Sequence, residues 1–143
     1  TMIRGRTMPS AIKPPFSFAS AQQKVQRAED LWNGKNPHQI VLSYTENSVW
    51  RNRNEFVQGR AAITGLLRRK WQRELDYRLK KQLFTYNDNR IAVHFEYEYH
   101  DDKGQWFRAY GNENWDFDAE GLMQARDASI NELAIEESAR RIF

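Results

Sequence analysis

Residues 90–117 read RIAVHFEYEYHDDKGQWFRAYGNENWDF, and this stretch decides the fold. Apolar and polar side chains alternate on both sides of Asp101–Gly104, as expected for two antiparallel strands joined by a tight turn. The alternation continues beyond this stretch and predicts strands over 78–86, 90–100, 105–117 and 122–131. We therefore expect a four-stranded antiparallel meander in the C-terminal half of the chain.

The turns also predict which residues face each other across the strands. In the first two hairpins the register that separates ion pairs from apolar pairs places Lys81 opposite Phe95, Phe95 opposite Gly111 and Val93 opposite Glu113. The same turn rule applied to the last hairpin places Phe117 opposite Met123, Trp115 opposite Ala125, Glu113 opposite Asp127 and Gly111 opposite Ser129.

The N-terminal half has a helical period. Apolar stripes predict helices over 18–32 and 60–76, with a short helix after Asn36-Pro37 and a short extended piece over 48–53. Ser20 with Gln23 is expected to form the N-terminal capping box of the first helix. Helices segregated from strands predict an α+β fold, in which a cone-like, curved antiparallel sheet wraps around the N-terminal helices and encloses a central pocket. Residues 1–16 are expected to be an extended arm, 17–131 the domain, and 132–143 a tail with a short helix as one option.

Composition limits the function classes. The 143 residues carry 22 Lys and Arg against 19 Asp and Glu, a formal net charge of +3, and no Cys. The basic stretch 60–81 fits the solvated face of one helix better than a nucleic-acid site. No apolar run approaches the ~18 residues of a membrane span, and no secretion signal is present, so we expect a cytoplasmic protein without nucleic-acid or membrane partners.

Three charged residues interrupt the predicted inner face of the sheet: Lys81, Glu113 and Asp127. Because Ala109 and Gly111 beside them have almost no side chain, we expect a cavity with polar groups inside it. Two directly opposed carboxylates cannot both ionise cheaply, so the pKa of Glu113 or Asp127 is expected to rise, which would create an acid/base pair. The alternative is a buried structural charge cluster without chemistry.

Further residues are expected to contact a ligand. Trp50 and Asn52 lie on one side of a short extended piece, with Arg51 and Arg53 on the other. The candidate ligand-binding residues are Trp50, Asn52, Phe95, Tyr97, Tyr99, Trp115 and Ser129. The three His residues have no metal-binding spacing, and no nucleotide-binding motif is present, so neither metal nor cofactor is expected.

Several local strings resemble one known superfamily. These are Ala28–Asn33, Trp50–Arg53, Lys70-Trp71 with Glu74–Arg78, Tyr110–Trp115 and Ala128–Asn131. They resemble the nuclear transport factor 2-like superfamily, which includes SnoaL-like polyketide cyclases, and more closely a branch of unknown function, over residues 17–131. The resemblance implies a cone-shaped fold with a pocket, and a homodimer through the outer face of the sheet. It implies no reaction.

Three functions fit these observations. The first is a cofactor-independent enzyme that transfers protons on a small, largely apolar molecule, in an isomerisation, cyclisation, hydration or elimination. Glu113 and Asp127 would then be base and acid, with Lys81 setting their charges. The second is a module that binds a small molecule without turnover. The third is a dimeric scaffold, whose predicted mixed-charge outer face includes Arg126.

Overall fold

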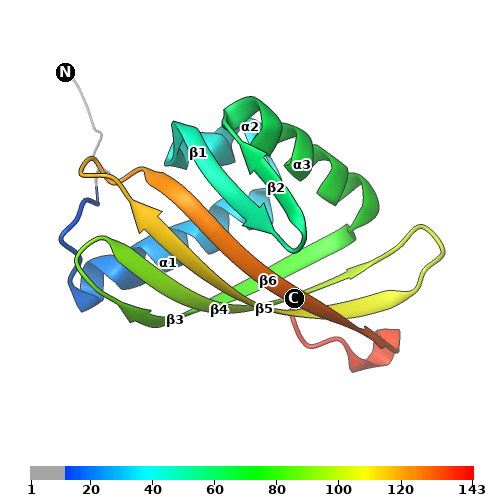
Figure 1. Cartoon of the computed structure of the whole chain (residues 1–143). Coiled ribbons are helices and arrows are strands. Elements are labelled where there is room, and N and C mark those ends of the chain that lie inside the picture. The colour runs from blue at the N-terminus through cyan, green and yellow to red at the C-terminus, as the bar shows by residue number, and fades with distance from the viewer. Residues whose placement is uncertain (1–11) are drawn as a thin grey trace, which may run out of the picture.

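The computed structural model of the chain describes residues 12–143, so residues 1–11 of the predicted arm lie outside the described part. Residues 12–143 fold into three α-helices, two 3₁₀-helices and six strands (Figure 1). In chain order these are α1 (Phe18–Gly34), α2 (Pro37–Ile40), η2 (Val41–Ser43), β1 (Tyr44–Asn52), β2 (Glu55–Gln58), α3 (Arg60–Arg73), β3 (Leu75–Tyr86), β4 (Arg90–His100), β5 (Trp106–Phe117), β6 (Met123–Ile135) and η3 (Glu137–Ala139).

One curved, unclosed sheet contains all six strands, in the order β2-β1-β6-β5-β4-β3. All neighbouring strands are antiparallel except β1 and β6, which are parallel. Helix α1 packs along β3 and α3 packs against β1, so that the helices cover one face of the sheet (Figure 1). The predicted α+β cone fold is therefore confirmed. No helix among residues 12–143 is long and apolar enough to cross a membrane.

Local sequence explains where the helices begin and end. The capping box of α1 is formed by Ser17 and Ser20, whereas the predicted pair started at Ser20. The α1 helix ends where Lys35 adopts a left-handed conformation with φ 55°. The Asn36 side chain accepts from the backbone N–H of His38 at the start of α2, as an N-cap followed by Pro predicts.

The structure contains more strand than the alternation predicts. Strand β2 forms over residues for which no strand was predicted, and β1 starts four residues earlier than predicted, at Tyr44. Strand β6 continues to Ile135, into the predicted tail. The last residues turn back onto the outer face, where the backbone N–H groups of Arg141 and Ile142 donate to the carboxylate of Glu98. Glu98, which also pairs with Arg108, is fully buried under this tail.

The predicted registers of the first two hairpins are confirmed. Lys81 lies opposite Phe95, Phe95 opposite Gly111 and Val93 opposite Glu113. Glu113 therefore shares the concave, helix-covered face with Phe95, and it is 2% exposed.

The predicted register of the last hairpin is wrong by one residue. Phe117 pairs with Met123, but Asp116 pairs with Ala125, so Gln124 is an extra residue on β6. Beyond this bulge Glu113 lies opposite Ala128, not opposite Asp127. Since successive side chains of a strand alternate between faces, the shift turns every later β6 side chain to the other side of the sheet. Asp127 is consequently on the outer face, and Arg126 is on the inner face with 3% exposure.

The space above Gly111 is filled. A Cβ atom built on Gly111 would lie 2.1 Å from Cζ of Phe95, so the Phe95 ring occupies the position that a side chain would need. Phe95 stacks on Tyr97, which contacts both Tyr77 and Tyr99. The small residues of β5 thus accommodate aromatic rings, and they do not create the central void that was expected from Ala109 and Gly111.

Gly111→Ala should therefore lower the free energy of unfolding by about 1–3 kcal/mol, the usual cost of overpacking a core. Gly65→Ala is the matched control. Its Cβ would meet only the flexible end of Arg69 at 3.6 Å, within a helix. It should raise stability by about 0.5–1 kcal/mol. Urea unfolding of the three proteins measures both effects. Recovery of stability by Phe95→Leu in the Gly111→Ala background would identify the ring as the cause, and a Gly111→Ala variant as stable as the parent would contradict it.

Candidate functional site

A buried carboxylate organises the interior of the sheet. Glu113 forms ion pairs with Lys81 from β3 and with Arg126 Nε from β6, the latter at 2.8 Å. Its Oε1 also accepts from Trp115 Nε1 at 2.7 Å. The Glu113, Lys81 and Arg126 side chains are at most 2% exposed, so the group is sealed from solvent.

These contacts set the charge of Glu113. Burial by itself would raise the pKa of its carboxyl, but attraction by Lys81 and Arg126, with hydrogen bonds from Lys81 and Trp115, lowers the pKa to about 2. Burial lowers the pKa of Lys81, and Glu113 opposes that effect. The expectation of a raised pKa in a Glu113–Asp127 pair is wrong, because the charged side chains that contact Glu113 are the cations Lys81 and Arg126.

Aromatic rings surround the two cations. Lys81 Nζ lies 4.6 Å from the centroid of the Phe95 ring and 5.5 Å from that of Trp115. The Arg126 guanidinium lies 4.5 Å from the Trp50 ring and 5.0 Å from the Trp32 ring. Cation–π contacts with desolvated cations are worth up to ~2 kcal/mol each. They offset part of the cost of burying two positive charges.

The predicted site residues divide between the two faces. Trp50, Phe95, Tyr97, Tyr99 and Trp115 are buried among the inner aromatic groups. Asn52 also reaches the inner side, where its Oδ1 accepts from Arg126 Nη1 at 3.1 Å.

Asp127 and Ser129, by contrast, lie on the outer face, where both bind Arg51. They are outside the interior for the same reason in each case, the one-residue shift of β6 at Gln124.

The sequence interpretation missed several interior polar residues. Arg126 was expected on the outer face, and only the bulge places it inside. Arg53 was predicted on the side opposite Trp50 and Asn52, yet its left-handed φ of 60° at the β1–β2 turn lets Nη2 reach Tyr97 OH at 3.3 Å and Glu132 at 2.8 Å. Lys70 forms a buried ion pair with Glu74 at 2.7 Å, and burial lowers the pKa of Lys70 to about 8. Their i,i+4 spacing on a predicted helix was the available signal.

A cavity of about 290 Å³ lies at the end of the interior where α1, η2 and the β5–β6 turn meet. Its walls are mainly aromatic and aliphatic, and Lys24, Arg27 and Glu120 are the charged residues along it. We call it the inner cavity; its other lining residues include Ala28, Leu31, Trp32, Ile40, Tyr44, Trp115, Phe117 and Met123. Trp32 and Trp115 separate it from the charged group around Glu113. A concave, mostly apolar space with few polar groups is typical of small-molecule sites, and this one is near the lower end of their ~300–1,000 Å³ range.

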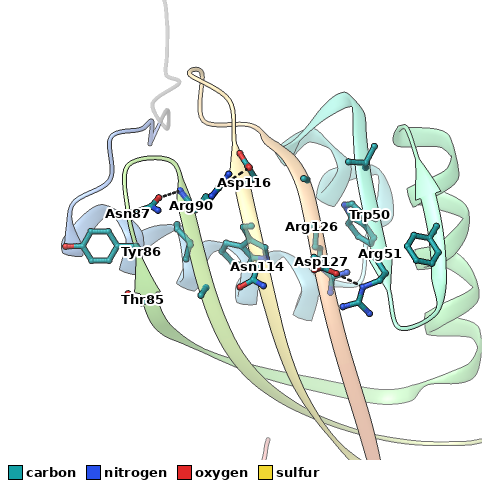
Figure 2. A pocket seen from close by; sticks show the side chains of 16 residues that line it. Trp50, Arg51, Thr85, Tyr86, Asn87, Arg90, Asn114, Asp116, Arg126 and Asp127 are labelled. Carbon is teal, nitrogen blue, oxygen red and sulfur yellow. Dashed lines mark hydrogen bonds and ion pairs between the residues drawn. The ribbon is translucent and has the colours of Figure 1, made fainter.

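A second concavity, of about 720 Å³, lies on the outer face of the sheet (Figure 2). We call it the outer groove. Two ion pairs, Arg51–Asp127 and Arg90–Asp116, lie within it, as Figure 2 shows. Exposed apolar side chains also line it, and Phe56 is 75% exposed. Among residues 12–143, no three His, Asp or Glu side chains gather closely enough to hold a metal ion.

Replacement of Glu113 tests the charged group. Glu113→Gln keeps the shape but leaves Lys81 and Arg126 without their carboxylate, so the free energy of unfolding at pH 7 should fall by about 3–5 kcal/mol. The folded pKa of about 2 lies below the ordinary value of 4.5. The stabilisation by the wild-type carboxylate is therefore present above about pH 4.5 and is lost as the pH falls towards 2.

Urea unfolding of both proteins between pH 7 and pH 2.5 should show the difference in stability narrowing with acid. Glu120→Gln is the control, since that exposed carboxylate should change stability by less than ~0.5 kcal/mol. A difference of the same size across the whole pH range would contradict the assigned pKa.

Comparison with solved structures places the fold among known proteins. An epoxide hydrolase/cyclase-like enzyme, SalBIII, superposes with a TM-score of 0.70 at 16% identity, over 79% of this chain and 92% of that chain. AclR, a putative hydroxylase from Streptomyces galilaeus, gives 0.69 at 16% identity, over 80% and 91%. An NTF2-like protein of unknown function from Burkholderia pseudomallei gives 0.70 at 13% identity, over 78% and 90%. At these identities the likeness shows a shared NTF2-like fold.

No curated protein matches the chain. Residues 14–143 match the family described as Protein of unknown function (DUF1348), a range that includes every helix and strand of the structure. The chain therefore belongs to the DUF1348 family, and it has an NTF2-like fold.

Proposed function

We propose that this domain binds a small, largely apolar molecule in the inner cavity. The observation that carries the proposal is the cavity itself, about 290 Å³ of mostly apolar space between α1, η2 and the β5–β6 turn. Trp115, one of the ligand residues expected from the sequence, lines it directly. Trp50, Phe95 and Tyr97 belong to the same buried core as Trp115.

Binding without turnover fits the chemistry better than proton transfer. Glu113 has a pKa of about 2, so it carries no proton to donate near neutral pH and is a weak base. Its side chain is also sealed behind Trp115. In this proposal Glu113, Lys81 and Arg126 hold the cavity wall in place. The named enzymes SalBIII and AclR share the fold, and fold alone does not transfer a reaction.

The probe N-phenyl-1-naphthylamine tests the site, because it is neutral and apolar and fluoresces brightly away from water. We expect one probe to bind per chain. Ala28→Phe should weaken binding at least tenfold, since Ala28 lines the inner cavity and a larger side chain fills it. Ala19→Phe, on the exposed side of the same helix, is the matched control and should leave binding unchanged. Binding that survives Ala28→Phe, or that depends on Phe56 of the outer groove, would refute the proposal.

We also propose that two copies of the chain associate through the outer face. That face presents exposed Val49, Phe56 and Tyr86 around the outer groove, with both charge signs nearby in Arg51–Asp127 and Arg90–Asp116. Paired charges of both signs around apolar side chains suit an isologous, self-complementary interface. The tail over Glu98 covers the other end of the face and would confine the interface to the groove.

Sedimentation at micromolar concentration should then give a mass about twice the 17.0 kDa of one chain. Phe56→Asp should shift the protein to the monomer, because a two-fold symmetric interface would contain the added carboxylate of both copies. The control Phe18→Asp changes another exposed Phe, on α1, and should leave the dimer intact. A wild-type monomer would rule out this association.

A further inference from the structure

Tyr44 has an unusual position beside the inner cavity. It is the first residue of β1, lines the cavity and is 3% exposed. Its ring packs edge-on against Trp50, with 5.2 Å between the ring centroids. Its hydroxyl oxygen accepts a hydrogen bond from Trp32 Nε1 at 3.3 Å. The backbone holds this position too, because the carbonyl of Tyr44 accepts two hydrogen bonds from the Arg60 guanidinium.

The hydroxyl of Tyr44 can donate one further hydrogen bond. A phenol is both donor and acceptor, and the indole N–H of Trp32 can only donate, so their bond uses only the acceptor side of the oxygen. Within residues 12–143, Trp32 is the one hydrogen-bond partner of this hydroxyl. Burial raises the pKa of Tyr44, so the proton stays on the oxygen at neutral pH. A buried donor without an acceptor costs ~1–3 kcal/mol, and a ligand atom in the cavity could relieve that cost.

The charges behind the wall favour an electron-rich partner. The Arg126 guanidinium lies 5.0 Å from the centroid of the Trp32 ring, and Lys81 Nζ lies 5.4 Å from the same centroid. These two cations share one carboxylate, Glu113. A ligand oxygen placed near Tyr44 would thus lie close to a buried group of two cations and one carboxylate, which has a net positive charge. Such a charge attracts the partial negative charge of an oxygen more strongly in a buried setting than in water.

We propose that Tyr44 determines ligand specificity by donating a hydrogen bond to an acceptor oxygen, a carbonyl or carboxylate, on the molecule held in the inner cavity. This inference rests on the proposed function, since it names the chemical class of ligand for the same cavity. The ligand class is an apolar molecule with one such oxygen at its inner end, and a pure hydrocarbon of the same shape is disfavoured.

Two probes of nearly equal shape test the inference. 2-Acetylnaphthalene carries a carbonyl oxygen, and 2-isopropylnaphthalene replaces that oxygen with a methyl group. Tyr44→Phe removes one oxygen from the protein and keeps the ring. We expect this variant to bind the ketone about 3- to 10-fold more weakly, the worth of one neutral hydrogen bond, and the hydrocarbon within twofold of wild type.

A merely structural role of Tyr44 would weaken both probes equally, and that result would overturn the inference, as would no change for either. Infrared spectra supply a measurement on the unmodified protein, in which the carbonyl stretch of bound 2-acetylnaphthalene should shift to lower frequency than in hexane. An unshifted band overturns the inference even if Tyr44→Phe does not fold. Ala28→Phe separates the two claims: it should abolish binding of both probes if the inner cavity is the site, and undiminished binding would reject the proposed function itself.

Discussion

The fold depends on one buried carboxylate. Glu113 joins three strands, because its partners Lys81 and Arg126 come from β3 and β6 while it stands on β5. Two cations and an anion removed from water are tolerated only when each finds close partners. Trp115 and the surrounding rings provide the remaining contacts, so that charge and aromatic packing fix the same positions. Two residues that contact this charged group, Trp32 and Trp115, also form part of the wall of the inner cavity.

Packing also decides where empty space remains. Phe95 fills the volume above Gly111, so the centre of the sheet is solid. The space left is at the end, where α1 and η2 approach the β5–β6 turn and where Trp32, Tyr44 and Trp115 form the wall. The charged group therefore lies behind the cavity and outside its lining. This separation supports our proposal of ligand recognition at Tyr44 over proton transfer by Glu113.

The two faces of the sheet have different partners. Helices α1 and α3 cover the concave face, while the chain's own last residues cover only one end of the convex face. Glu98 and Arg108, which alternation alone would leave in solvent, are buried as a result. The rest of the convex face keeps the outer groove and its exposed apolar side chains. In the dimer that we propose, a second copy of the chain would cover these apolar side chains of the outer groove.

The sequence by itself determined the α+β class, the residues at which the helices begin and two of the three hairpin registers, because local periodicity and turn type act over neighbouring residues. Only the tertiary structure decided the third register. One extra residue, Gln124, exchanges Arg126 and Asp127 between the faces, and nothing in the alternation marks it. The parallel pairing of β1 with β6 joins segments more than 70 residues apart. The pairing of Phe95 with Gly111 was predicted, but not that the Phe95 ring fills the space above Gly111. Such contacts depend on how the whole sheet curves and packs, so local patterns could name the residues of the interior but not which charges would meet there.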